Sequence, residues 1–164
     1  MHCQQADHYT DPTVGVRECT TLCTEGLYGD PVSGRCVEEC LPGYFAFNDT
    51  NLCLKTCPNG FADNETRTCV AICPAPTFAD SLTNKCSRIC SGTQYGEGRV
   101  CVGKCTDLTY GNPLTRECES GCPDFDYSFA DDNTNLCVRD CSDYPNQYAD
   151  RSVNKCVANC SLAI

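Results

Sequence analysis

Cysteine is the residue with the greatest capacity for chemistry in this chain, because 19 of its 164 residues are cysteines. A thiolate can bind zinc, act as a nucleophile or be oxidised to a disulfide. Apart from Cys3, the cysteines form pairs with three residues between them, C-x3-C, at 19/23, 36/40, 53/57, 69/73, 86/90, 101/105, 118/122, 137/141 and 156/160. The residues around these pairs decide between the three chemistries.

Zinc binding and thiol catalysis are both disfavoured. Structural zinc sites favour C-x2-C spacing, whereas every pair here is C-x3-C and the only histidines are His2 and His8. A cysteine nucleophile needs a neighbouring base, and no histidine follows His8. The acidic residues recur at one position of a repeat, which is typical of turns rather than of a single acid–base pair. We therefore predict that the chain is not an enzyme and has no catalytic residues, no metal ligands and no cofactor.

The density of cysteine predicts a disulfide-rich protein from an oxidising compartment, secreted or at the cell surface. Large apolar residues are too few to fill a single core, and there is no tryptophan, so cross-links must supply much of the stability. The first residues, MHCQQADHYT, lack the apolar segment of a secretory signal. We therefore expect the sequence to be a mature or trimmed chain.

The charge balance is acidic, with 22 acidic and 12 basic residues and a net charge of −10. No basic patch is available to neutralise phosphates, so we expect no nucleic-acid partner. The acidic residues are spread along the chain, which is typical of a solvated surface. No apolar stretch approaches the roughly 20 residues of a membrane span, so we expect no membrane insertion by this segment.

The cysteine pairs recur at a period of about 17 residues, which is typical of a repeat array. Asp or Asn recurs between the pairs, as at Asp63 and Asp131, and Thr often follows it, as at Thr66 and Thr134. Val is frequent after the first cysteine of a pair. An aromatic residue lies eight residues before most pairs, at Tyr28, Phe45, Phe61, Phe78, Tyr110, Phe129 and Tyr148.

These features predict one β-hairpin per repeat. The aromatic segment is the first strand, the Asp and Thr side chains hydrogen-bond a turn, and the segment Cys-Val-x-x-Cys is the return strand. No stretch has a 3.6-residue period, so we expect no significant helix. We predict a small disulfide-rich fold of β-hairpin repeats, in which about nine units form an elongated rod or superhelical solenoid with the aromatic residues packed between units. The array is predicted to be a single one over residues 1–164, open at both ends.

The residues alone leave two regular disulfide connectivities open. A bond within one C-x3-C pair would be strained. Bonds from the second cysteine of each pair to the first cysteine of the next would leave Cys160 over. An interleaved scheme, with first bonded to first and second to second in alternate pairs, would leave Cys19 alone.

A family resemblance favours the first connectivity. The segment CPNGFADNETRTCVAIC (57–73) resembles the furin-like cysteine-rich modules of growth-factor receptors, and the recurring FAD and TNKC elements resemble long cysteine-rich surface proteins of ciliates and other protists. Two-disulfide modules and a leucine-rich ligand-binding domain are missing, so a growth-factor receptor role does not carry over. Single-disulfide modules of the furin-like family bond the second cysteine of one pair to the first of the next. The resemblance thus implies Cys160 unpaired within the chain and the loops Cys3–Cys19, Cys23–Cys36, Cys40–Cys53, Cys57–Cys69, Cys73–Cys86, Cys90–Cys101, Cys105–Cys118, Cys122–Cys137 and Cys141–Cys156.

N-glycosylation is the modification that the sequence predicts best. Asn48-Asp49-Thr50 and Asn64-Glu65-Thr66 are N-x-S/T sequons at the same position of adjacent repeats, where a hairpin tip is expected. Asn159-Cys160-Ser161 is a third and weaker match because it contains a cysteine. The same Thr position recurs without a sequon in other repeats, so a structural role for Thr is the competing explanation.

Calcium is a second possible ligand. The segments ADDNTN (130–135) and FNDTN (47–51) are rich in oxygen ligands. They do not match a spaced calcium loop that is closed by a bidentate Glu, and turn capping explains the same residues.

The leading functional hypothesis is an extracellular structural protein, a disulfide-cross-linked and glycosylated rod that forms a surface coat, a stalk or a head-to-tail filament. The chain starts and ends inside a repeat, so we expect self-association into a polymer or continuation of a longer array. The alternative is a cysteine-rich stalk module of a receptor or adhesin that binds a protein.

Overall fold

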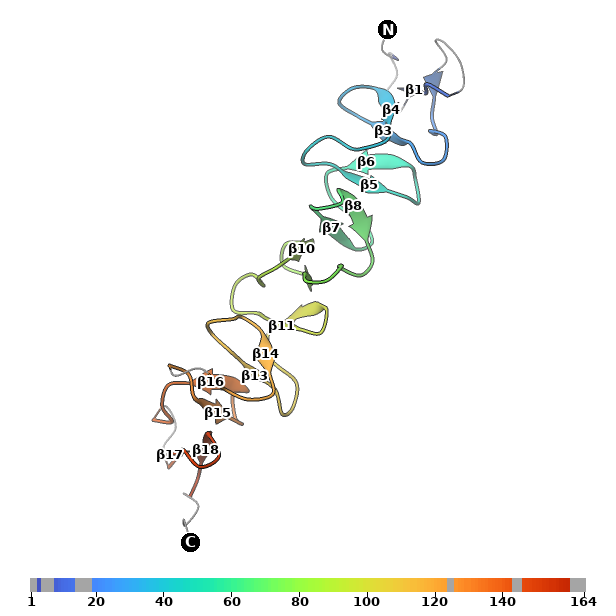
Figure 1. Cartoon of the computed structure of the whole chain (residues 1–164). Coiled ribbons are helices and arrows are strands. Elements are labelled where there is room, and N and C mark those ends of the chain that lie inside the picture. The colour runs from blue at the N-terminus through green and yellow to red at the C-terminus, as the bar shows by residue number, and fades with distance from the viewer. Residues whose placement is uncertain (1–2, 4–7, 14–18, 124–125, 143–145, 160–164) are drawn as a thin grey trace. The chain divides into compact units, whose positions relative to one another are not determined.

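A computed structural model describes residues 3, 8–13, 19–123, 126–142 and 146–159 (Figure 1). These residues form 18 strands of two or three residues and no helix. The strands follow one another as nine hairpins, which confirms the predicted fold of small disulfide-rich β-hairpin repeats. With no helix in the part of the chain that is described, none is long and apolar enough to cross a membrane.

Each hairpin consists of one aromatic strand and one cysteine strand. The first strand begins with the aromatic residue that the repeat pattern singles out, and the return strand contains the first cysteine of a pair. In the fourth hairpin, for example, Phe61 lies opposite Val70 and Ala62 opposite Cys69. The hairpins are β1 (Tyr9–Thr10) with β2 (Cys19–Thr20), β3 (Tyr28–Asp30) with β4 (Arg35–Val37), β5 (Phe45–Phe47) with β6 (Leu52–Leu54), β7 (Phe61–Asp63) with β8 (Thr68–Val70), β9 (Phe78–Asp80) with β10 (Lys85–Ser87), β11 (Tyr95–Glu97) with β12 (Val100–Val102), β13 (Tyr110–Gly111) with β14 (Cys118–Glu119), β15 (Phe129–Asp131) with β16 (Leu136–Val138), and β17 (Tyr148–Asp150) with β18 (Lys155–Val157).

Parallel pairing connects successive hairpins. The first strand of one hairpin pairs with the return strand of the next, as in β1 with β4, β3 with β6, β5 with β8, β13 with β16 and β15 with β18. Only one residue pair is involved each time, for example Ala46 opposite Thr68. Strands β1 to β10 therefore follow the order β9-β10-β7-β8-β5-β6-β3-β4-β1-β2, and strands β13 to β18 the order β14-β13-β16-β15-β18-β17.

The chain divides into two compact units. The first contains Met1–Pro74 and Ala79–Cys86, and the second contains Ala75–Phe78 and Ser87–Ile164. Within each unit, hairpins that are adjacent in sequence lie side by side (Figure 1). The single array over residues 1–164 stays a prediction.

The buried apolar side chains of the described residues form small separate clusters. A typical cluster contains a disulfide, an aromatic ring from one hairpin and an alanine from the next, as in the group of Phe45, Cys57, Ala62 and Cys69. Such a cluster needs few large apolar residues because sulfur atoms fill much of its volume. This arrangement accounts for a folded chain with a low content of large apolar residues.

Candidate functional site: the joints between hairpins

The described residues contain nine disulfides: one joins Cys3 to Cys19, and each of the others joins the second cysteine of one pair to the first cysteine of the next. Their Cα atoms lie 5.4–6.0 Å apart, within the usual range for a disulfide. Cys160 lies outside the described residues. The bonds are Cys3–Cys19, Cys23–Cys36, Cys40–Cys53, Cys57–Cys69, Cys73–Cys86, Cys90–Cys101, Cys105–Cys118, Cys122–Cys137 and Cys141–Cys156.

We use the word joint for the contact between one hairpin and the next. At a joint, the middle residue of a first strand donates its amide N–H to a carbonyl of the following hairpin. Gly29 donates to Asn51 and Gly111 to Asn135, both at 2.8 Å. The same bond runs from Ala46 to Arg67, Ala62 to Asn84, Gly96 to Arg116 and Ala130 to Asn154.

The residue that accepts this bond has a left-handed backbone. Asn51 and Asn135 have φ values of 52° and 56°, a conformation that Asn adopts more readily than most residues. Their side chains then reach back across the joint: the Asn135 amide nitrogen donates to the Cys105 carbonyl at 2.9 Å, and that of Asn51 to the Cys23 carbonyl at 3.3 Å. Arg67, at φ 53°, donates to the Cys40 carbonyl at 3.0 Å in the same way. One residue thus bonds two hairpins through both its backbone and its side chain.

A small residue in the middle of the first strand lets the hairpins approach. A Cβ added to Gly29 would lie 2.6 Å from the Tyr9 ring of the preceding hairpin, and one added to Gly111 would lie 2.9 Å from the Tyr95 ring. Other repeats have Ala at this position, and Ala46 and Ala130 are 4% and 2% exposed. The aromatic ring of one hairpin therefore packs on the Gly or Ala of the next.

The recurring Asp or Asn caps the hairpin turn. The Asp63 side chain accepts hydrogen bonds from the Glu65 amide at 3.0 Å and from the Thr66 hydroxyl at 2.7 Å. The Asp131 side chain accepts the equivalent bonds from the Asn133 amide and the Thr134 hydroxyl at 3.0 and 2.7 Å. These acidic side chains are almost fully buried, at 2% and 1% exposure, so they stabilise the turn that the sequence predicts.

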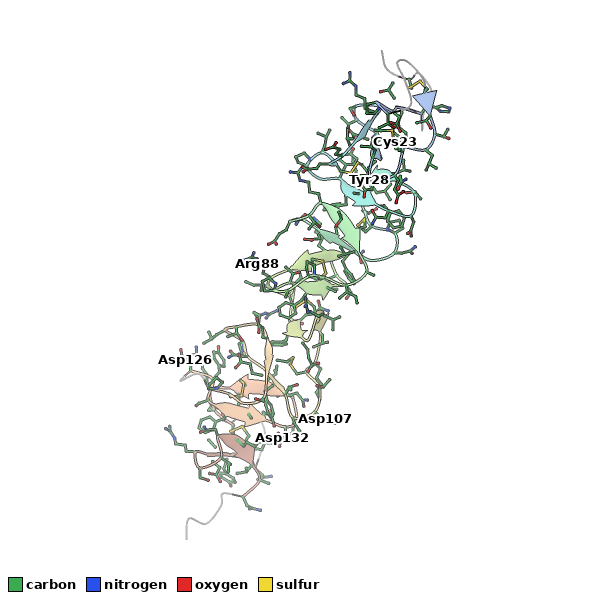
Figure 2. The ribbon with its side chains drawn as sticks, turned by 45° about the vertical axis from the view of Figure 1, so that its right-hand side comes forward. Cys23, Tyr28, Arg88, Asp107, Asp126 and Asp132 are labelled. Atoms are coloured by element: carbon green, nitrogen blue, oxygen red, sulfur yellow. A yellow bond between two sulfur atoms is a disulfide. The ribbon has the colours of Figure 1, made fainter. Side chains whose placement is uncertain are left out.

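The two main sequons lie at hairpin tips. Asn48 and Asn64 are exposed, and Asn159 is exposed as well. The hydroxyl of Tyr28, a residue of the preceding hairpin that Figure 2 labels, donates to the Asn48 side-chain oxygen at 2.7 Å. The bond uses the side-chain oxygen of Asn48 and not its amide nitrogen, which is the atom to which a glycan would be attached. We call the contact between hairpins β3/β4 and β5/β6 the Tyr28 joint.

The equivalent contact between hairpins β13/β14 and β15/β16, the Tyr110 joint, contains charged groups, among them Asp132, which Figure 2 labels. The Lys155 ammonium donates to the Tyr110 hydroxyl at 2.9 Å, and that hydroxyl donates to the Asp132 carboxylate. Lys155 also lies 3.3 Å from Asp132 and 5.4 Å from the centre of the Tyr110 ring. Tyr110 itself is only 3% exposed.

These contacts shift the ionisation of all three groups. The hydrogen bond from Tyr110, assisted by Lys155, lowers the pKa of Asp132 below 3.8 although partial burial opposes the shift. The hydrogen bond with Tyr110, together with Asp132, raises the pKa of Lys155 above 10.5. Burial and the Asp132 carboxylate raise the pKa of Tyr110 above 10.0. The three groups therefore hold one another in the Lys⁺, neutral Tyr and Asp⁻ state over a wide pH range.

A pocket of about 430 Å³ lies beside this joint and is lined in part by Tyr110, Glu119, Ala130 and Lys155. Its charged side chains already have partners: Lys155 contacts Tyr110 and Asp132, and Glu119 accepts hydrogen bonds from Asn112 and Thr115. In the described part of the chain, no three His, Cys, Asp or Glu side chains are grouped as they would be around a metal ion. In the oxygen-rich segment 130–135, Asp131 caps a turn and Asp132 belongs to the Tyr110 joint.

The left-handed residue and the small strand residue of each joint were not predicted from the sequence. Their signal is present in the sequence, since Asn or Arg recurs two residues before a cysteine and Gly or Ala follows the first-strand aromatic residue in every hairpin after the first. No protein-family model, no curated protein and no solved structure matches the chain.

Proposed function

We propose that the chain is an extracellular structural protein, a disulfide-cross-linked array that carries N-glycans at its hairpin tips and forms part of a surface coat, a stalk or a filament. The density of disulfides indicates an extracellular or secreted module with a structural or binding role. The structural role is favoured by one observation. The same joint, with its disulfide, its buried cap and its backbone hydrogen bond, recurs along the chain.

The mechanism is mechanical. A force along the chain is transmitted through covalent loops whose bonded cysteines are 11 to 16 positions apart, because one disulfide closes each hairpin. Between disulfides, the force acts on the backbone and side-chain hydrogen bonds of the joints. Several side chains that could otherwise carry chemistry, such as Asp63, Asp131 and Tyr110, are used in caps and joints.

The glycan part of the proposal rests on the tips. Asn48 and Asn64 are exposed sequon residues, and the many disulfides favour a protein that passes through the secretory pathway. Glycans there would shield neighbouring tips from proteases. Asn159 is a further acceptor in this proposal, with lower priority because cysteine is the middle residue of its sequon.

The first test measures the cellular location of the protein and its resistance to proteolysis. An antibody against the full chain is expected to label intact, unpermeabilised source cells or the material around them, whereas labelling confined to the cytosol would refute the proposal. The purified chain is expected to resist a broad-specificity protease until its disulfides are reduced. Rapid digestion of the oxidised chain would count against a structural role.

The second test concerns glycans. Secreted chain from a eukaryotic host is expected to lose mass on treatment with an amidase that removes N-glycans, and the variants Asn48→Gln and Asn64→Gln are each expected to lose one glycan. Ser81→Ala, at the equivalent tip position of another repeat and outside any sequon, is the matched control. A secreted chain with no change in mass would refute the glycan part and leave the structural part standing.

The alternative function is binding of a protein ligand by a cysteine-rich stalk. Exposed apolar side chains favour it, including Leu108 at 77%, Ile72 at 73% and Ile89 at 66% exposure. They belong to different repeats, and single exposed apolar residues are normal on a protein surface. Capture of one defined partner by the oxidised chain, lost on changing these residues to Ser, would favour the alternative.

A further inference from the structure

The two main sequons differ in the residue that precedes the asparagine. Asp63 precedes Asn64, and Phe47 precedes Asn48. The two preceding residues are equivalent, since Asp63 ends β7 and Phe47 ends β5, and each lies opposite the first residue of its return strand. Asp63 has a carboxylate at this position and Phe47 has no hydrogen-bonding side chain, so the two sequons are held differently.

The Asn64 sequon is bound by the cap of its own hairpin. The Asp63 carboxylate accepts a hydrogen bond from the amide of Glu65, the middle residue of the sequon, at 3.0 Å and one from the hydroxyl of Thr66, its third residue, at 2.7 Å. The Thr66 hydroxyl also lies 2.7 Å from that of Thr68. Hydrogen bonds to a carboxylate are among the stronger ones in proteins, and Asp63 is 2% exposed. The hydroxyl that defines this sequon is therefore occupied while the hairpin is folded.

The Asn48 sequon has no such cap. Its turn contains a long backbone hydrogen bond, from the Thr50 amide to the Phe47 carbonyl at 3.4 Å. In the part of the chain that the structure describes, no side chain bonds the Thr50 hydroxyl, and Thr50 is exposed. The Tyr28 hydroxyl contacts the side-chain oxygen of Asn48 and not its nitrogen. The Asn48 nitrogen and the Thr50 hydroxyl are therefore both accessible in the folded hairpin.

Transfer of an N-glycan depends on these two atoms. The amide nitrogen of the asparagine forms a bond to the anomeric carbon of the first sugar, and the bond between that carbon and the diphosphate of a lipid-linked oligosaccharide breaks. The amide loses one proton, and the lipid diphosphate leaves. An N-x-S/T sequon is defined by the hydroxyl of its third residue, so the transferase must bind that hydroxyl while the nitrogen reacts. A hydroxyl that is held by a cap has to be released first.

We propose that glycosylation of Asn64 competes with the folding of its own hairpin, whereas Asn48 remains an acceptor after folding. The inference rests on the proposed glycans at these two tips. The Cys57–Cys69 disulfide closes the hairpin that contains the Asp63 cap, so its formation ends the period in which Asn64 is modified. A glycan attached before that time does not interfere with the cap, because the Asn64 side chain is exposed and is not one of the groups that Asp63 binds.

A transfer assay on the full chain tests this competition. Chain without glycans, made in a bacterial periplasm, is incubated with a purified oligosaccharyltransferase and a lipid-linked oligosaccharide, either oxidised or after reduction and alkylation. Mass spectrometry of the two glycopeptides gives the initial rate at each site. The oxidised-to-reduced ratio of rates at Asn64 is expected to be about tenfold or more below the ratio at Asn48, since the cap holds its sequon by two hydrogen bonds to a charged group.

An exchange of the preceding residues isolates the cap. Phe47→Asp gives the Asn48 hairpin a carboxylate at the cap position and is expected to lower the ratio at Asn48 toward that at Asn64. The matched control Phe47→Ala removes the same ring without adding a carboxylate and is not expected to lower the ratio. Asp63→Ala removes the cap and is expected to raise the ratio at Asn64. A variant that failed to fold would raise a ratio, so a fall with Phe47→Asp cannot come from unfolding.

Three results would overturn the inference. Equal ratios at Asn48 and Asn64, with transfer at both, would show that folding does not distinguish the two sites, and the proposed glycans would stand. An unchanged ratio at Asn48 in Phe47→Asp would show that the cap is not the cause. Absence of transfer to both sites in the reduced chain would refute the glycan part of the proposed function and this inference with it.

Discussion

The Tyr28 joint and the Tyr110 joint use the same parts to connect two hairpins and differ in one position. In both, a middle Gly donates to a left-handed Asn whose side chain reaches back to a cysteine carbonyl. The residue at the tip differs: Asn48 accepts the tyrosine hydroxyl in one joint and Asp132 in the other. The residues that both joints share therefore stabilise the fold, whereas the residue at the tip can vary between a glycan acceptor and a charged side chain.

Lys155 adds to this difference. It comes from the hairpin after the Tyr110 joint and donates to the Tyr110 hydroxyl, so that three hairpins of the second unit contribute to one cluster. The Tyr28 joint has no described ammonium group on its tyrosine hydroxyl. Changes in the shared parts should therefore affect both joints alike, and changes in the tip should separate them.

The largest effect is expected from the shared disulfides. Replacing Cys40 and Cys53 together by Ala, or Cys122 and Cys137 together by Ala, is expected to cost about 2–5 kcal/mol of local stability in each case. The loops have similar separations of 13 and 15 residues, so the two losses should be similar. Hydrogen exchange of the affected hairpins measures the loss, since an array of repeats need not unfold in one step. A large loss at only one joint would show that the joints are not equivalent.

The next effect tests the packing of the rings. Ala46→Val adds two methyl groups against the Tyr28 ring and is expected to cost about 1–3 kcal/mol. Ala130→Val is expected to cost less, because Ala130 lines the pocket beside Tyr110, which can take up part of the added volume. Ala71→Val, at an exposed position, is the control. Denaturant unfolding measures the free energy of unfolding of all three variants. An equal loss for Ala46→Val and Ala130→Val would show that the pocket does not take up the added volume.

The tyrosine hydroxyls come third. Tyr28→Phe removes one hydrogen bond to a neutral amide and is expected to cost about 0.5–1.5 kcal/mol. Tyr110→Phe is expected to cost somewhat more, since its hydroxyl is buried and connects two charged groups. The gain from charge is limited because the side chains of Asp132 and Lys155 are 64% and 36% exposed. A double-mutant cycle of Tyr110→Phe with Asp132→Asn isolates the pair, and a coupling near zero would contradict the assigned bond.

The sequence predicted the hairpins well because each one is specified locally. The aromatic strand, the Asp cap and the cysteine strand lie within one repeat, so Phe61, Asp63 and Cys69 are sufficient to place a hairpin. The joints are formed between residues about 20–30 positions apart, such as Asn135 and Cys105. Both types of residue recur at fixed positions, but the left-handed backbone at Asn135 and the close contact at Gly111 involve a neighbouring repeat, so the recurrence alone did not reveal their role.

The Tyr110 cluster was less predictable still. Tyr110, Asp132 and Lys155 come from three repeats, and equivalent positions elsewhere have other residues, such as Asn48 in place of Asp132 and Thr68 in place of Lys155. The fold of a repeat array is predicted from the residues that its repeats have in common, whereas this cluster depends on residues that differ from repeat to repeat. Only the stacking of three hairpins brings the groups together.

The smallest effect is the pH dependence that this cluster gives to the second unit. The pKa of Asp132 is lowered in the folded state, so its contribution to stability is present above its unfolded pKa of 3.8 and is lost as the pH falls through the lower folded value. The pKa of Lys155 is raised, so its contribution is present below 10.5 and is lost as the pH rises through the higher folded value. The difference in unfolding free energy between the unchanged chain and Asp132→Asn should therefore be constant from about pH 5 to 9 and should shrink in strong acid. Asn48→Asp places a carboxylate in the Tyr28 joint, where no lysine accompanies it. It should therefore raise the unfolding free energy by less than Asp132→Asn lowers it at the Tyr110 joint. An Asp132→Asn difference that stays constant down to pH 2 would show that the tip charge contributes nothing to the joint.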